Sequence, residues 1–471
     1  MTTRIGFFSL LYLLIAGFSQ AQPFVFPPDK FPDLPAQEPV SIGQEALTEA
    51  IDLSNRNRGL SKISAIDDSG RVKYSNSEFW PKGAWFRGYA SEVSAEELLR
   101  FFDGSRTIYF GTHPLYRYTS QQVRAMIHLH PLVAQNDSLA ALVEEVVEDG
   151  TRHLLNDFKE NDYYTWFYER PGQFKVNSNE QRIFPDSLRS NVGHIYETGH
   201  VLATLCDVIS FKKSRGMELD YELVEKTGSV AKTLIRKEEE SSSSNYSAFA
   251  LWSISKAFKV SRDTACLLKM KEICGRLLRT QTLDLAADNP CQGVWRVGQE
   301  GEGFHEGKMS YHLIVLKSLW EAIDALPRSE KDLRLKLRTA IRAGMNHIAM
   351  HRMRLKEDLT VNDFSLEFYG PDTNCVVGGQ LFQYLFYDDA LETFALAAYY
   401  SKINPELFDS EEQQAFVGLL HHVAQTIDTA VDPIWTNELT AAKCLSSMAY
   451  YLDYWRAVSS DRLVFEEDGW K

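Results

Sequence analysis

The chain has 471 residues, and its 64 Asp and Glu outnumber its 50 Lys and Arg, which gives a formal net charge of −14. This acidic balance argues against general binding to nucleic acids or anionic membranes, but it leaves room for a local basic cleft. Six cysteines in this length are too few for a disulfide scaffold. Cys291 and Cys375 fall in predicted loops and are the pair that we consider for a bridge.

The N-terminus has the pattern of a secretory signal. Arg4 supplies a positive charge, and an apolar run over 5–18 precedes a small-residue cleavage site that ends at Ala21. The run is short for a membrane span, and no second long apolar run follows it. We predict a signal peptide over 1–21, a Pro-rich extended lead-in over 22–42, and a secreted or periplasmic protein without stable membrane insertion.

The mature chain has apolar residues at helical spacing in twelve stretches. These stretches lie at 43–57, 119–135, 137–157, 189–214, 219–238, 244–259, 261–280, 307–325, 329–352, 378–402, 411–430 and 436–456. Many of the connections are short, as expected between antiparallel neighbours, and long connections separate the pairs. This alternation predicts a single all-α domain over 43–471, an (α/α)6 toroid of helical hairpins. The helix at 43–57 would close the ring beside the helix at 436–456.

An open α-solenoid is the alternative architecture, although no fixed sequence repeat supports it. Several helices carry start signals that either architecture needs. Ser261, Ser329 and Ser410 are candidates for N-caps, and acidic residues follow the last two in the first helical turn.

In a toroid, the long connections would run from each outer helix to the next inner helix and share one face of the ring. Long ordered loops are usually functional, and these are rich in aromatic residues that suit the apolar faces of sugar rings. Trp166, Tyr168 and Trp295 are candidates for stacking on a substrate; the alternative is that such aromatics anchor the loops in the core. The stretches 163–169 and 365–369 are candidates for short strands over the opening.

The same loops carry basic residues. Arg296 and Lys308 are candidates for binding the carboxylates of a uronate substrate, helped by the positive ends of the inner helices. Solvated surface charge is the alternative interpretation for such residues.

Two helix starts carry dense clusters of reactive side chains. Asn191, His194 and Glu197 follow one another at spacings of three and lie near one helical stripe. Lys308 and Tyr311 share a face in the first turn of a later helix, where positive neighbours favour a phenolate. Such a tyrosine can take a proton from a sugar C5 or give one to the leaving oxygen. The alternative is a buried tyrosine with a satisfied hydroxyl.

Other groups near the helix starts complete the set of candidates. Those assigned to substrate binding are Glu197, Glu306, His312, Asn437 and Glu438. The spacing does not match a zinc motif, so we expect neither a metal nor a redox cofactor.

Acidic pairs offer a rival chemistry, because glycoside hydrolysis uses two carboxylates. The candidates are Glu306, Glu367, Asp388, Asp389 and Glu438, and no spacing rule selects a pair among them.

Two segments resemble the toroidal alginate-lyase type of polysaccharide lyase. The stretch 190–197, Ser-Asn-Val-Gly-His-Ile-Tyr-Glu, is similar to the family's Asn-Asn-His-Gly-x-Trp-Tyr-Asp. The stretch 308–319, Lys-Met-Ser-Tyr-His-Leu-Ile-Val-Leu-Lys-Ser-Leu, is similar to the family's helix that begins Tyr-Ser-Leu-Phe-x-Leu-x-x-Leu after a Ser and a basic residue.

The resemblance implies that Asn191 contacts the substrate carboxylate and that Tyr311 is the acid or base. The family's catalytic His falls on Val192, which has no acid–base chemistry, so His194 is the residue that would replace it.

These observations lead to three functional hypotheses. The first is an exported lyase that cleaves a uronate-containing polysaccharide by β-elimination, with Tyr311, His194 and Asn191 as catalytic residues. The second is a toroidal glycoside hydrolase with a carboxylate pair, and the third is a non-catalytic glycan-binding protein. All three take a polysaccharide or oligosaccharide as partner, an anionic one in the first.

Overall fold

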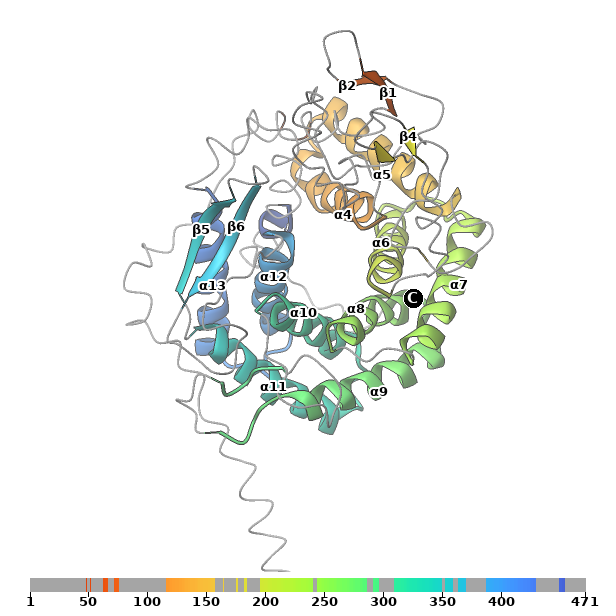
Figure 1. Cartoon of the computed structure of the whole chain (residues 1–471). Helices are drawn as coiled ribbons and strands as arrows, with labels where there is room; N and C mark the ends of the chain where they lie inside the picture. The colour runs from red at the N-terminus through yellow and green to blue at the C-terminus, as the bar shows by residue number, and fades with distance from the viewer. Residues whose placement is uncertain are drawn as a thin grey trace, which may run out of the picture.

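The protein folds as a ring of helical hairpins (Figure 1). The computed structural model describes residues 116–156, 164, 195–239, 244–285, 291–295, 309–349, 387–428 and 449–453, together with Thr48, Ile51 and six short strands.

Among the described residues, five helices line the inside of the ring: α4 (Tyr116–Val133), α6 (Ile195–Ser214), α8 (Ser244–Ser261), α10 (Met309–Ala325) and α12 (Tyr387–Ile403). Five more of the described helices form the outside: α5 (Asp137–Asn156), α7 (Tyr221–Glu238), α9 (Thr264–Thr280), α11 (Lys331–Ala349) and α13 (Ser410–Asp428). Each of these inner helices packs against the outer helix that follows it, and each of the first four also packs against the next inner helix (Figure 1). This is the arrangement that the alternating helix pattern predicted.

The inner helices run parallel to one another. The evidence is that contacts between neighbouring helices join residues at similar distances from the two helix starts. Near the starts, the backbone N–H of Arg117 on α4 donates to Glu197 on α6. Near the ends, Lys259 on α8 donates to Glu321 on α10. All five N-termini therefore lie on one face of the ring, which we call the N-terminal face. Their partial positive charges add there.

The ring is closed by the C-terminal part of the chain. Residues 449–453 are helical, and Asp453 lies 2.8 Å from His128 Nδ1 on α4. The hydroxyl of Tyr451 lies 3.0 Å from His421 Nδ1 on α13. Because the last helical segment contacts the first inner helix, the toroid is confirmed and the open solenoid is wrong. Ile51, at the predicted ring-closing helix, is helical and fully buried.

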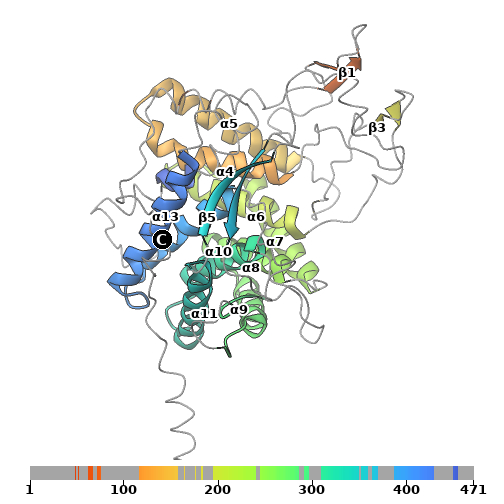
Figure 2. The ribbon, with the colours of Figure 1, turned by 60° about the vertical axis from the view of Figure 1, so that its left-hand side comes forward.

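Three antiparallel ribbons accompany the helices: β1 (Lys62–Ile66) with β2 (Val72–Ser75), β3 (Lys175–Val176) with β4 (Arg182–Ile183), and β5 (Arg352–Asp358) with β6 (Asp363–Tyr369). The last ribbon connects α11 to α12 and lies beside α13 (Figures 1 and 2). It contains 365–369 and confirms that strand prediction. In the other predicted strand, Tyr164 has no regular structure and its neighbours lie outside the described residues.

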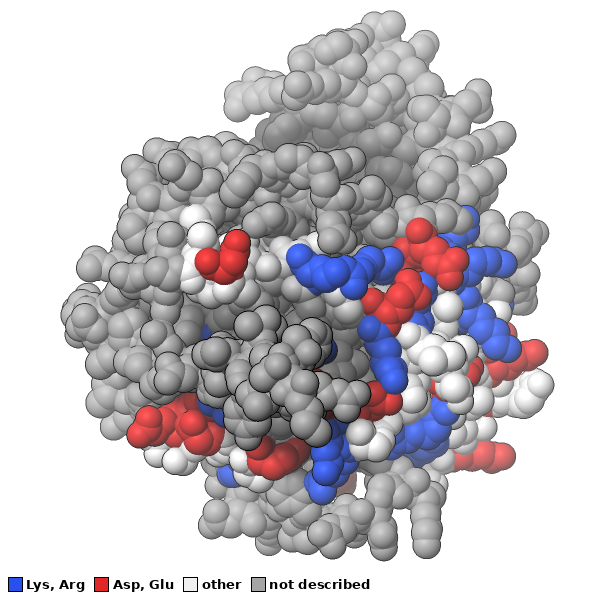
Figure 3. Space-filling view, turned by 90° about the horizontal axis from the view of Figure 1, so that it is seen from below, with Lys and Arg blue, Asp and Glu red and all other residues white. Residues whose placement is uncertain are grey.

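Inner and outer helices differ in how much surface they bury. On α6, every residue from Ile195 to Cys206 is buried, whereas α7 buries only one side of the helix. An outer helix needs only one apolar stripe, because its other side faces water. Charges of both signs are interspersed on the surface that Figure 3 shows. No helix among those described is both long and apolar enough to cross a membrane.

The helix starts differ from all three cap predictions. Helix α11 begins at Lys331, so the residue in the cap position is Glu330 and not Ser329. The N-cap of α9 is Asp263, whose carboxylate accepts from Ala265 N, whereas Ser261 belongs to the end of α8. At α13, Asp409 and Glu412 each accept the other's backbone N–H. This reciprocal pair is a capping box, and it makes Asp409 the cap instead of Ser410.

Gly293 occupies a position that tolerates no side chain. Its φ is +89°, and a Cβ there would lie 2.1 Å from the carbonyl oxygen of Ala343 on α11. We expect Gly293→Ala to lower the free energy of unfolding by about 2–4 kcal/mol, because strain and a backbone clash add. Gly216 is the matched control: its φ is +66° but its surroundings are open. Gly216→Ala should lower the free energy of unfolding by only about 1–2 kcal/mol. Chemical denaturation measures both variants, and an equal loss of stability in the two would contradict the steric role of Gly293.

Candidate functional site

Three acid–base side chains occupy equivalent positions at the N-terminal face. Glu197, Tyr246 and Tyr311 are each the third residue of their helix, on the adjacent inner helices α6, α8 and α10. The third residues of α4 and α12 are Tyr118 and Asp389, whose side chains lie outside the described set. We call Glu197, Tyr246 and Tyr311 the acid–base triplet.

The two tyrosines are the partly exposed positions in otherwise buried stretches of α8 and α10. From residue 244 to 255, Tyr246 is the one side chain that is not buried, and from 311 to 323 the same holds for Tyr311. Burial raises the pKa of Tyr246, and the nearby Tyr311 raises it further. Tyr311 is therefore close enough to affect the protonation of Tyr246.

Glu197 is fully buried and pairs with α4. Its Oε2 accepts the backbone N–H of Arg117 at 2.8 Å, and its Oε1 lies 3.6 Å from the Arg117 Nε. Burial raises the pKa of Glu197 to about 7, because the loss of hydration outweighs the attraction of Arg117. A carboxyl group that titrates near neutral pH is suited to proton transfer.

The raised pKa makes a stability prediction for Glu197→Gln. The folded protein binds this proton more tightly than the unfolded chain, whose pKa is near 4.5. The contribution to stability is therefore full below pH 4.5 and is lost as the pH rises through 7. Across this pH range, we expect the free energy of unfolding of the wild type to fall by about 3 kcal/mol relative to that of Glu197→Gln. Denaturation at a series of pH values measures it, and parallel stability curves would contradict the assignment.

His200 lies one helical turn deeper than Glu197. Its ring packs against Tyr196 at 4.9 Å, Phe249 at 5.2 Å and Trp252 at 5.3 Å between centroids. Burial lowers its pKa well below the usual value, and nearby cations add to the effect. It is a core histidine, and neither ring nitrogen has a hydrogen-bond partner within the part of the chain that the structure describes.

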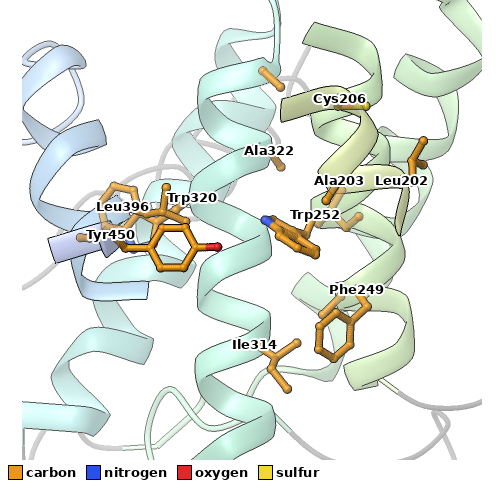
Figure 4. Close-up of a cluster of buried hydrophobic side chains, with 14 of the residues drawn as sticks. Leu202, Ala203, Cys206, Phe249, Trp252, Ile314, Trp320, Ala322, Leu396 and Tyr450 are labelled. Carbon is orange, nitrogen blue, oxygen red and sulfur yellow. The ribbon is translucent and has the colours of Figure 1, made fainter. Parts of the chain in front are cut away.

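Below this layer, Glu392 of α12 holds two buried cations at the centre of the ring. It accepts from Arg124 of α4 and, at 3.2 Å, from Lys317 of α10. Both cations also lie against the ring of Trp252. The distance to the ring centroid is 4.5 Å from the Arg124 Cζ and 4.4 Å from the Lys317 Nζ. The Arg124 guanidinium lies 5.2 Å from the ring of Tyr450. The indole nitrogen of Trp252 and the hydroxyl of Tyr450 point toward one another (Figure 4).

The ion pairs continue toward the C-terminal ends of the inner helices. Asp207 lies 2.8 Å from both Arg124 and Lys256, and Lys259 lies 2.8 Å from Glu321 and 2.7 Å from Asp324. Positive and negative groups alternate, which offsets part of the cost of burying each one. We call the eight residues the axial ion network: Lys317, Glu392, Arg124, Asp207, Lys256, Glu321, Lys259 and Asp324.

The network holds its carboxylates ionised. Burial alone would raise the pKa of Glu392, but Arg124 and Lys317 outweigh it and lower the value to about 2. Lys256 and Arg124 likewise hold the pKa of Asp207 below its usual value against the effect of burial. These groups therefore stay charged at neutral pH and serve the packing of the ring.

Two predicted substrate-binding residues lie in the core. Trp295 is 2% exposed, and its indole N–H donates to Leu277 O at 3.0 Å. Its ring fills the space beside Gly344, where an added Cβ would lie 2.6 Å away. His312 Nε2 lies 2.8 Å from the Gly344 carbonyl oxygen. Both side chains pack between helices and have no open face for a sugar, so we leave them out of the proposed site.

The structure brings Glu197 and Tyr311, among the predicted site residues, to the N-terminal face. The remaining predicted residues have side chains outside the described part of the chain: Asn191, His194, Lys308, Arg296, Trp166, Tyr168, Glu306, Asn437, Glu438, Glu367, Asp388 and Asp389.

Sequence reasoning missed Tyr246 and Arg117. A signal for Tyr246 was present, because it stands in the first turn of a predicted helix, as Tyr311 does. Arg117 lay just before the predicted start of its helix, so nothing marked its proximity to Glu197.

The described fold is that of a helical-hairpin toroid. No protein-family model matches the chain, and no curated protein matches it in sequence. Among solved structures it is similar to a sugar epimerase from a ruminal bacterium, with 10% identity and a TM-score of 0.47 over 82% of this chain and 86% of that chain. A polysaccharide lyase matches with 10% identity and a TM-score of 0.43 over 72% and 92% of the two chains. A glycoside hydrolase family 76 mannosidase from Bacteroides thetaiotaomicron matches with 6% identity and a TM-score of 0.45 over 88% and 98%. Likenesses at these scores carry no conclusion about activity.

Proposed function

We propose that the protein is an exported enzyme that cleaves a uronate-containing polysaccharide by β-elimination at the N-terminal face of the ring. The observation that carries this proposal is the acid–base triplet, in which Glu197, Tyr246 and Tyr311 stand at the same height on three adjacent parallel helices. Proton transfer is the central chemistry of β-elimination, and Tyr246 and Tyr311 are the partly exposed members of the triplet that can supply it.

In the proposed reaction, Tyr311 takes the C5 proton of the uronate. The electrons of the C5–H bond form the C4–C5 double bond, and the C4–O bond breaks toward the leaving sugar. The leaving oxygen then needs a proton. Asn191 would neutralise the uronate carboxylate and so acidify the C5 proton, and His194 would be a second base.

An acidic protein can still bind an anionic substrate on this face. The N-termini of the five described inner helices lie on this face and favour negative charge. Arg117 lies in the first turn of α4, and the pKa of its partner Glu197, about 7, leaves part of that pair without a full negative charge. Arg296 and Lys308 would add to this potential.

The cysteines support export. Cys206, Cys266 and Cys274 are free, whereas Cys291 is disulfide-bonded. Structural disulfides form and persist in oxidising compartments. This agrees with the predicted signal peptide over 1–21 and with a secreted or periplasmic location.

The test is product analysis on a panel of polyuronates with neutral polysaccharides as controls. Elimination leaves an unsaturated sugar, and the summed product mass equals that of the substrate. Hydrolysis adds one water for each bond broken. We expect unsaturated ends from at least one polyuronate, and new reducing ends that always carry added water would overturn the lyase proposal.

A glycoside hydrolase is the second candidate, because the pKa of Glu197 near 7 suits a general acid. It predicts cleavage of a neutral glycan with uptake of water and complete loss of this activity in Glu197→Gln. In the lyase, the same variant should keep its elimination chemistry and change mainly in its pH dependence.

A further inference from the structure

A second tyrosine stands beside Tyr311, and the proposed reaction needs a second proton-transfer group. We propose that Tyr246 is the general acid, which protonates the leaving oxygen while Tyr311 acts as the base. This inference rests on the proposed function and deepens it by assigning the second half of the proton transfer.

The placement of the two phenols carries the inference. Helices α8 and α10 are adjacent and pack along their lengths, and each presents a tyrosine as its third residue. After each tyrosine, every residue is buried over 247–255 on α8 and over 312–323 on α10. A substrate that reaches one phenol at this face therefore finds the other on the neighbouring helix.

The surroundings of Tyr246 fix it in place. Ser244, Asn245 and Ser247 are all buried, and Phe249, one turn further along, packs on Tyr196 at 4.0 Å between ring centroids. The start of α8 is therefore held firmly on both sides of the tyrosine. Precise positioning of this kind is what a proton donor needs.

The surroundings of Tyr246 suit the role of proton donor. Burial raises the pKa of Tyr246, and the nearby Tyr311 raises it further. Tyr246 therefore enters the reaction with its proton and can donate it to the leaving oxygen.

The proton balance closes within the pair. Tyr311 gains the C5 proton as the C4–C5 double bond forms, and the C4–O bond breaks with its electrons on the leaving oxygen. That oxygen takes the phenolic proton of Tyr246. After product release, the proton on Tyr311 passes to the Tyr246 phenolate, which restores the starting state. The net result moves one proton from C5 to the leaving oxygen.

A leaving group that needs no proton separates the two roles. On a 4-fluoro uronide, elimination releases fluoride, so a general acid contributes little. We expect Tyr246→Phe to lower kcat/KM on the polysaccharide by about 10²–10⁴-fold and to leave the fluoride substrate nearly unchanged. Tyr311→Phe should lose both activities. Tyr221→Phe, at a tyrosine that is 77% exposed on α7, is the control and should lose neither.

The wild-type protein provides a measurement that does not depend on how a variant folds. On the polysaccharide, kcat/KM should fall at alkaline pH as the general acid loses its proton. On the fluoride substrate this alkaline fall should be absent. The inference would be overturned if kcat/KM fell in the same way at alkaline pH on both substrates. It would also be overturned if a folded Tyr246→Phe lost kcat/KM equally on both. Either result would leave the lyase proposal standing. A wild-type protein that yields unsaturated product from neither substrate overturns the proposed function and this inference with it.

Discussion

Glu392→Gln is expected to lower the free energy of unfolding by about 3–5 kcal/mol, because it leaves two buried cations without their shared counter-ion. Arg124 and Lys317 are each 1% exposed, and neither can turn to water without leaving the centre of the ring. The glutamine keeps the shape of the side chain and removes only the charge. The loss therefore measures the electrostatic role of the carboxylate.

The effect should also depend on pH. The lowered pKa of Glu392 means that its contribution is present above the unfolded value of 4.5 and is lost as the pH falls toward 2. The gap between wild type and Glu392→Gln should narrow over that range. Chemical denaturation of both proteins at neutral and acidic pH gives the comparison.

Glu330→Gln is the matched control. Glu330 lies 2.8 Å from Lys271, but these side chains are 28% and 39% exposed. Exposed ion pairs contribute about 0–1 kcal/mol, so the free energy of unfolding of this variant should be close to that of the wild type. Equal losses in the two variants would contradict the assignment of Glu392 to the structural centre of the ring.

Tyr311→Phe is expected to lower kcat/KM by at least about 10³-fold on the polysaccharide substrate, because it removes the proposed base and retains the ring. The phenyl ring still packs at the edge of the core, so the melting temperature should change little. The measurement pairs initial rates with thermal unfolding on the same preparations.

Tyr399→Phe provides a comparison at the other end of the inner helices. Tyr399 lies near the end of α12, on the side of the ring that carries Lys259 and Asp324. Full activity in Tyr399→Phe together with a loss in Tyr311→Phe would place the chemistry at the N-terminal face. A fully active Tyr311→Phe would remove this residue from the mechanism.

Much of the helical ring could be predicted from the sequence, because apolar periodicity reports which side of a helix is buried. Helices such as 137–157 and 219–238 were predicted within a few residues of their observed bounds. The caps were harder. An Asp one or two residues from a candidate Ser, as at Asp263 and Asp409, competes for the same backbone N–H groups, and the spacing alone does not decide between them.

The axial ion network could not be predicted, because its members come from five hairpins and their partners lie on other helices. Nothing near Arg124 in the sequence marks Glu392, which lies 268 positions away. Local sequence was also misleading for Trp295, which was predicted to bind substrate and lies in the core. In sequence it is an aromatic residue in a polar loop, and it lies in the core only because Gly344 on α11 leaves space for its ring.

The site was predicted in part for a similar reason. Tyr311 and Glu197 stand at helix starts, and helix starts can be read from local sequence. That Tyr246 lies beside Tyr311 depends on the packing of α8 against α10, which local patterns do not encode.

The most direct test of the central claim is the mass of the products that the purified protein releases from a polyuronate, measured for wild type beside Tyr311→Phe. The account predicts oligosaccharides with unsaturated ends and no added water from wild type, and none from the variant. Products that all carry added water, or an unsaturated product formed equally by the variant, would contradict it.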